Sequence, residues 1–80
     1  MITDFPYTFF LTDGAKVVVD EENAHKYKFV IFRKDNSIHR FEWSSPAGGI
    51  AGGTVISDDK KSVTDEEFEA VQTFWGLQRQ

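Results

Sequence analysis

The side chains that could carry acid–base or nucleophilic chemistry are few in this chain and lie far apart. It has two histidines and no cysteine. His25 and His39 each stand without a second imidazole at the spacing of a zinc site, and three or four ligands cannot be assembled around either. Ser44 and Ser45 lie near glycines but show no nucleophile-elbow pattern and no neighbouring base. The sequence therefore predicts a protein that is not an enzyme and that holds no metal and no cofactor.

Two runs of carboxylates, at residues 20–22 and 58–59, also lack the pattern of a cation site. A calcium loop places oxygen ligands at alternate positions around a glycine, whereas the carboxylates here are consecutive. We expect both runs to be solvated turns. His39 is expected to be a packed or edge histidine, because the sequence places no partner beside it.

The glycine-rich segment 46–53, PAGGIAGG, is the one stretch that could bind a ligand. Backbone amides without side chains can cradle a phosphate, but the segment lacks the GK[ST] ending of a P-loop. Three interpretations stay open: a plain connector, a small anionic ligand such as a nucleotide held by a homo-oligomer, or a segment laid against a partner. Nearby lysines would add charge, and a tryptophan would add a stacking surface. The ligand site would use Gly48, Gly49, Gly52, Gly53, Lys60, Lys61 and Trp43.

Charge and hydropathy limit the classes of partner. The net charge is −4, and the basic segment 26–45 has acidic segments on both sides. A nucleic-acid-binding domain usually shows a basic surface or stripe, so we do not expect nucleic-acid binding. No apolar stretch approaches the roughly 20 residues of a membrane helix, and the N-terminus lacks the pattern of a signal peptide. We therefore expect no membrane contact and a cytoplasmic location.

Two predicted β-hairpins, at residues 7–19 and 26–45, determine which side chains share a face of the sheet. Residues 7–12 and 15–19 are β-rich runs on either side of Asp13 and Gly14. Asp-Gly between such runs predicts a two-residue type I′ turn, because glycine accepts a positive φ. The pairs in that register are Phe10 with Val17, Phe9 with Val18 and Thr12 with Ala15.

Residues 26–45 are expected to form the second and longer hairpin. A three-residue loop from Lys34 to Asn36 places Asn36 in the left-handed conformation that asparagine tolerates. Aromatic residues then share one face, and opposite charges meet across the strands on the other. The face expected to form the core holds Tyr27, Phe29, Ile31, His39, Phe41 and Trp43. The second face holds Lys28, Val30, Phe32, Ile38, Arg40 and Glu42.

The C-terminal segment 64–76 is predicted to be a helix. Thr64 and Glu67 have the spacing of a capping box, and the acidic residues of the first turn favour the positive end of the helix dipole. Gly76 is interpreted as the left-handed residue that ends the helix. The apolar stripe is expected to be Phe68, Ala70, Val71, Phe74 and Trp75.

Together these elements predict a single α+β domain over residues 1–80. It is an antiparallel sheet of four or five strands, two consecutive hairpins with or without a short strand at 54–57, and the C-terminal helix packs on one face. Eighty residues are close to the lower limit for one hydrophobic core. The aromatic fraction of 15% compensates, because each buried ring removes roughly 150–250 Å² from water.

One helix covers only one face of such a sheet. Either the N-terminal hairpin folds over the second face, or another protein or a second copy covers it, because monomers rarely expose a large contiguous apolar patch. We predict a non-enzymatic protein-binding module that occludes a partner surface or oligomerises through this face. It is of the small inhibitor or adaptor type, which includes phage-encoded accessory proteins. Its predicted contact residues are Lys28, Val30, Phe32, Ile38 and Arg40. The alternative function is the homo-oligomer that sequesters a nucleotide.

Overall fold

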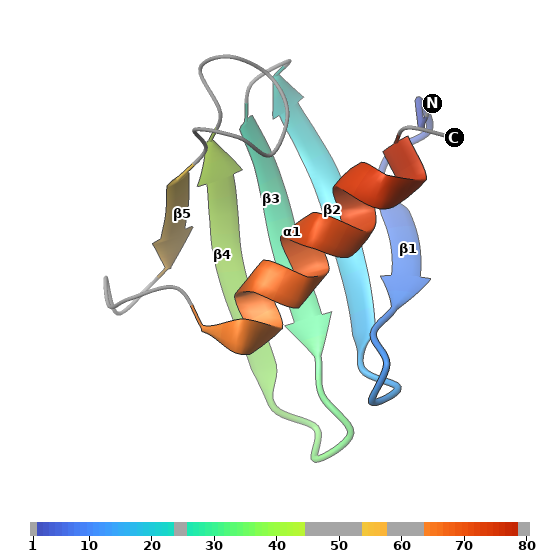
Figure 1. Cartoon of the computed structure of the whole chain (residues 1–80), viewed down its shortest axis with the longest axis vertical. Coiled ribbons are helices and arrows are strands. Elements are labelled where there is room, and N and C mark those ends of the chain that lie inside the picture. The colour runs from blue at the N-terminus through green and yellow to red at the C-terminus, as the bar shows by residue number, and fades with distance from the viewer. Residues whose placement is uncertain (1, 24–25, 45–53, 58–63, 79–80) are drawn as a thin grey trace.

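A five-stranded antiparallel sheet crossed by one helix makes up the part of the chain that this computed structural model describes, residues 2–23, 26–44, 54–57 and 64–78 (Figure 1). The strands lie in chain order, and each pairs antiparallel with the next. The elements are β1 (Tyr7–Phe10), β2 (Lys16–Asn23), β3 (Lys26–Phe32), β4 (Ile38–Ser44), β5 (Thr54–Ser57) and α1 (Asp65–Gln78). The expected α+β fold is confirmed, and the short run at 54–57 is the fifth strand.

The core lies between the sheet and α1, which crosses the strands diagonally on what we call the covered face (Figure 1). Phe29 stacks on Phe41 with ring centroids 4.9 Å apart, and Phe74 of α1 meets Phe29 edge-on at 5.7 Å. Aromatic pairs of these geometries contribute about 0.5–1.5 kcal/mol beyond the area they bury. The buried apolar residues are Phe9, Leu11, Ala15, Val17, Val19, Tyr27, Phe29, Ile31, Phe41, Trp43, Ala70, Val71 and Phe74.

The register expected for the second hairpin is confirmed. The pairs are Tyr27 with Trp43, Phe29 with Phe41 and Ile31 with His39 on the covered face, and Lys28 with Glu42, Val30 with Arg40 and Phe32 with Ile38 on the other. Asn36 has φ 72°, the left-handed conformation that the three-residue loop requires. The Arg33 amide donates to the Ser37 carbonyl oxygen at 2.9 Å and closes the loop.

The register expected for the first hairpin is wrong by one residue. Phe9 pairs with Val17, and Phe10 pairs with Lys16. The loop has three residues, closed by the Leu11 amide donating to the Ala15 carbonyl oxygen at 2.9 Å. A two-residue loop would have aligned buried positions of one strand with exposed positions of the other, because side chains alternate between faces. The three-residue loop keeps the apolar positions of both strands on the covered face.

This first hairpin continues the sheet and does not fold over its second face. β2 pairs with β3 along its length, from Lys16 opposite Phe32 to Asn23 opposite Lys26, with a bulge near Glu21. β1 is therefore a strand at the edge of the same sheet. Of the two arrangements expected for the second face, the small sandwich is excluded for the described residues, and the face stays uncovered by them.

The helix differs from the expected one in its buried stripe and in its end. Its fully buried residues are Glu67, Ala70, Val71 and Phe74, whereas Phe68 is 54% exposed. Gly76 does not end the helix, which continues to Gln78, and Gly76 does not adopt the positive φ of a left-handed cap. The last turn is held because Leu77 packs on the core and the Ile2 amide donates to the Gln78 side chain.

Candidate functional site

The sheet face opposite α1 is the candidate functional surface, and we call it the open face. Its residues alternate with the core residues along β1 to β4, so the pleat alone directs them away from the helix. Within the described ranges, no strand or helix lies over it. Its residues are Thr8, Phe10, Lys16, Val18, Asp20, Glu22, Lys26, Lys28, Val30, Phe32, Ile38, Arg40 and Glu42.

One end of the open face is charged and neutralises itself. Lys26 Nζ lies 3.2 Å from a carboxylate oxygen of Glu22 and 3.2 Å from one of Glu42, and Lys28 Nζ lies 3.6 Å from Glu22. The hydrogen bond from Lys26 lowers the pKa of Glu22. The bonds to Glu42 and Glu22 raise the pKa of Lys26. We call these four residues the charged end.

The other end of the open face is apolar. Phe10, Lys16, Phe32 and Ile38 form a row across β1 to β4, one residue from each strand. Phe10 is 64% exposed, Ile38 47% and Phe32 36%. Lys16 Nζ lies 4.8 Å from the centroid of the Phe32 ring, a distance at which a cation is attracted to a ring face.

The next row of strand pairs adds Val18, Val30 and Arg40 to this surface. The two valines are half-buried and Arg40 is exposed. We call these three residues together with the first row the apolar end. Neither Lys16 nor Arg40 forms an ion pair with any residue that the structure describes. The apolar end therefore combines exposed rings with two cations that form no ion pair with the described part of the chain.

The predicted contact residues Lys28, Val30, Phe32, Ile38 and Arg40 all lie on the open face. Lys28 belongs to its charged end and the other four to its apolar end. The predicted contact residues did not include Phe10 and Lys16, because the sequence left open which residues of the first hairpin share the second face. The signal that would have found them is in the loops, where Thr12-Asp13-Gly14 has the same pattern as Lys34-Asp35-Asn36.

The alternative ligand site is not assembled by the described residues. Its four glycines (Gly48, Gly49, Gly52 and Gly53) and its lysines (Lys60 and Lys61) lie outside them. Trp43 lies in β4 and is 7% exposed on the covered face. Its indole ring is packed in the core, so it offers no open ring face on which a nucleotide could stack.

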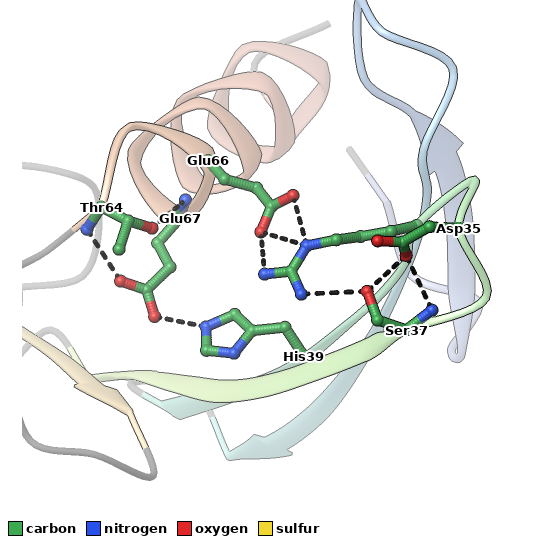
Figure 2. Close-up of polar contacts among 7 residues, drawn as sticks. Asp35, Ser37, His39, Thr64, Glu66 and Glu67 are labelled. Carbon is green, nitrogen blue, oxygen red and sulfur yellow. Dashed lines mark hydrogen bonds and ion pairs between the residues drawn. The ribbon is translucent and has the colours of Figure 1, made fainter.

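A second polar cluster ties the start of α1 to the sheet (Figure 2). The capping box is formed as expected: the Glu67 amide donates to Thr64 Oγ1 at 3.1 Å, and the Thr64 amide donates to Glu67 Oε1 at 2.9 Å. The second carboxylate oxygen of Glu67 lies 2.6 Å from His39 Nε2. Glu67 is 1% exposed. His39 is thus a packed histidine, and its partner is this buried carboxylate.

The same cluster continues along the β3–β4 loop. Arg33 binds Glu66 through Nε, at 3.0 and 3.1 Å, and through Nη2 at 2.6 Å. These hydrogen bonds raise the pKa of Arg33. Arg33 Nη1 donates to Ser37 Oγ at 3.2 Å, and Ser37 donates from Oγ and from its amide to Asp35, which lowers the pKa of Asp35.

These contacts hold α1 against the β3–β4 hairpin. The imidazole, the guanidinium and the hydroxyl in the cluster each already contact a neighbouring group. Among the described residues, no group of three or more histidine and carboxylate side chains could hold a metal ion. This polar cluster joins α1 to the β3–β4 hairpin. The open face is therefore the candidate functional site.

Comparison with known proteins adds no assignment. The chain matches no family model, no curated protein and no solved structure. In the described part of the chain, α1 is too short and too polar to cross a membrane. Any function therefore has to be argued from the surface itself.

Proposed function

We propose that this chain is a non-enzymatic protein-binding module, of the inhibitor or adaptor type, that acts in the cytoplasm by covering a partner's surface with its open face. One observation carries the proposal: Phe10, Phe32 and Ile38 stand exposed in a single row across four paired strands. Scattered surface hydrophobic residues are ordinary, but a contiguous group that is bordered by polar residues is typical of an interaction site.

The composition of the apolar end supports this proposal. Aromatic residues and arginine are enriched at protein interfaces and supply most of the residues whose removal costs binding energy. Phe32 lies inside the row, with Lys16 against its ring and Ile38 beside it on β4. A central ring with such neighbours is the arrangement in which a truncation is most costly, because the surrounding contacts exclude water.

The charges of the open face indicate the chemistry of the partner. Lys16 and Arg40 lie beside the rings and form no ion pair with the described residues, so an apolar surface edged with carboxylates complements them. The charged end contributes little affinity, because its ion pairs are already formed and exposed. We expect it to form the solvated rim of the interface.

The test is a capture experiment with three baits. The wild-type chain, Phe32→Asp and the control Thr3→Asp are immobilised and exposed to an extract of the cells that contain the protein. Thr3 is exposed in the segment before β1, and its neighbours Ile2 and Phe5 pack on the core, so its variant adds the same charge outside the open face. We expect one partner to be retained by the wild type and by Thr3→Asp and to be lost with Phe32→Asp. Equal retention by all three baits would contradict the proposal.

A further inference from the structure

A third exposed ring lies on the opposite side of the molecule from the apolar end. Phe68 of α1 is 54% exposed, although it sits in the first half of a helix that packs on the sheet. The buried stripe of α1 runs through Glu67, Ala70 and Phe74. A residue one position after Glu67 is rotated by about 100° from it on a helix of 3.6 residues per turn. Phe68 therefore projects from the flank of α1, next to the exposed residues Asp65 and Gln72.

The helix that carries Phe68 is acidic. Its first turn holds Asp65, Glu66 and Glu67, its last turn holds no basic residue, and Glu69 follows Phe68 directly. Three of these carboxylates are used within the molecule: Glu66 by Arg33, Glu67 by His39 and Glu69 by Thr12. Asp65 forms no ion pair with the described residues, and it lies one helical turn before Phe68. We call Asp65, Phe68 and Gln72 the helix flank.

The helix flank and the apolar end have opposite charges and both expose rings. The helix flank pairs one ring with a carboxylate, and the apolar end pairs its rings with Lys16 and Arg40. In the described structure these two surfaces hold all the exposed large hydrophobic side chains, which are Phe10, Phe32, Ile38 and Phe68. Surfaces with such complementarity can bury their rings against each other while each unneutralised charge gains a partner.

We propose that the helix flank of one copy docks on the apolar end of a second copy, in a head-to-tail arrangement. This inference rests on the proposed function, because it uses the open face as a binding surface, and it names a second copy of the chain as one occupant. Phe68 then packs against the Phe32 and Ile38 row, and Asp65 approaches Lys16 or Arg40. Self-association covers the apolar end until a partner protein displaces the neighbouring copy.

A symmetric pair of open faces fits the charges less well. A two-fold interface brings the same patch of both copies together. If the apolar ends met, Lys16 and Arg40 of both copies would bring four positive charges into one interface, where they repel one another. If an apolar end met a charged end, exposed rings would be buried against ion pairs such as that of Lys26 and Glu42. The head-to-tail contact avoids both, and being heterologous it builds rings or open chains of copies.

Sedimentation equilibrium of the purified chain over a range of concentrations tests this inference. We expect the mean mass to rise with concentration and to fall with added salt, because the contact is partly ionic. Phe32→Asp and Phe68→Gln should each weaken self-association by at least about tenfold, as expected for central rings of an interface. Both residues are at least 36% exposed, so the variants should fold, and circular dichroism checks this. If Phe68→Gln failed to fold, Asp65→Lys would test the same flank.

Mixing the two variants gives the decisive result. Phe32→Asp keeps an intact helix flank and Phe68→Gln keeps an intact apolar end, so an equimolar mixture should form a one-to-one dimer that neither variant forms alone. A wild-type chain that stays monomeric at about millimolar concentration, near the weak limit of specific binding, would overturn the inference. So would a mixture that stays monomeric.

The outcomes also separate this inference from the proposed function. If Phe32→Asp abolished self-association and Phe68→Gln did not, the helix flank would be the wrong occupant, and the open face would still be a binding surface. If neither variant changed self-association, the head-to-tail contact would be wrong. The capture experiment would then decide the proposed function independently, because it measures a different partner on the open face.

Discussion

Glu67 shows how one buried carboxylate connects the ends of several elements. Its two oxygens contact the Thr64 amide and His39 Nε2, so it caps α1 and joins the helix to β4 with one side chain (Figure 2). Burying a carboxylate is costly unless its oxygens are satisfied by hydrogen bonds. Both oxygens are satisfied here, which explains why a glutamate occupies a core position that the apolar pattern had assigned to its neighbour Phe68.

Replacing Glu67 should therefore destabilise the protein more than replacing its neighbour. We expect Glu67→Ala to lower the free energy of unfolding by about 2–4 kcal/mol, since it leaves a cavity, an uncapped amide and an unpaired imidazole. The control is Glu66→Ala, which removes the ion pair with the partly exposed Arg33 and should cost at most about 1 kcal/mol. Urea unfolding of both variants measures the difference. Equal losses of unfolding free energy in the two variants would show that Glu67 is not the central residue of the polar cluster between α1 and the hairpin.

The two hairpin loops have the same conformation, although the sequence predicts a three-residue loop only for the second. Each has three residues, an aspartate in the middle and a left-handed third residue, Gly14 with φ 91° and Asn36 with φ 72°. Asp13 Oδ1 accepts from the Ala15 amide at 2.9 Å, and Asp35 Oδ1 accepts from the Ser37 amide at 2.9 Å. Asp-Gly also favours a two-residue turn, so local sequence alone leaves two registers open.

The burial of side chains on the covered face decides between these two registers. The few residues of a loop do not show which strand side chains will be buried. The second hairpin was predictable because its aromatic residues fall on one face in only one register. In the first hairpin several registers bury apolar residues, since Val17, Val18 and Val19 are consecutive. The helix stripe was missed for a related reason: the capping box was recognised, but the buried stripe was drawn from apolar residues alone and so included Phe68 in place of Glu67. The two hairpins and the helix were predictable because they follow from alternation, turn residues and capping. Whether the first hairpin continues the sheet or folds over its second face was left open by the sequence.

The end of the helix gives a prediction that separates the expected structure from the observed one. Gly76 lies inside α1 without a positive φ, and an added Cβ would have no atom within 4 Å. Gly76→Ala should therefore stabilise the protein by about 0.5–1 kcal/mol, the difference in helix propensity between the two residues. If Gly76 instead ended the helix in the left-handed conformation, alanine at this position would destabilise the protein. Thermal unfolding of the variant beside the wild type shows which sign is correct.

The two faces of the sheet differ in what covers them and in which residues they carry. The covered face is closed by α1 and holds the core, whereas the open face exposes rings at one end and ion pairs at the other. The protein therefore does not need its open-face rings for the core that α1 closes. That independence is what allows the open face to be altered by substitution without loss of the fold.

The ionisable groups of the whole molecule predict how its stability depends on pH. The pKa of Glu22 is lowered by its hydrogen bond with Lys26, and that of Asp35 by its bonds with Ser37. Stability from these groups is present above their unfolded pKa and is lost as the pH falls through the lowered folded value. The pKa of Lys26 is raised by Glu42 and Glu22, and that of Tyr27 by burial and by Glu21. Their contribution is present below the unfolded pKa and is lost as the pH rises through the raised one.

From these four groups we expect a thermal midpoint that is level between roughly pH 5 and pH 9 and that falls on both sides. Differential scanning calorimetry between pH 2 and pH 11 measures the profile. Asp35→Asn should make the acid-side fall shallower and leave the alkaline side unchanged. A midpoint that rises as the pH drops below 4 would contradict the assignment of Glu22 and Asp35.

In the function proposed above, the open face binds a protein through its apolar end. The most direct measurement is the dissociation constant of the captured partner, by calorimetric titration, for the wild type, Phe32→Asp and Thr3→Asp. We expect Phe32→Asp to raise it by at least about tenfold, because a central ring is replaced by a charge in a desolvated contact, and Thr3→Asp to leave it within about twofold. A dissociation constant unchanged by Phe32→Asp would show that the partner binds elsewhere and would contradict the account.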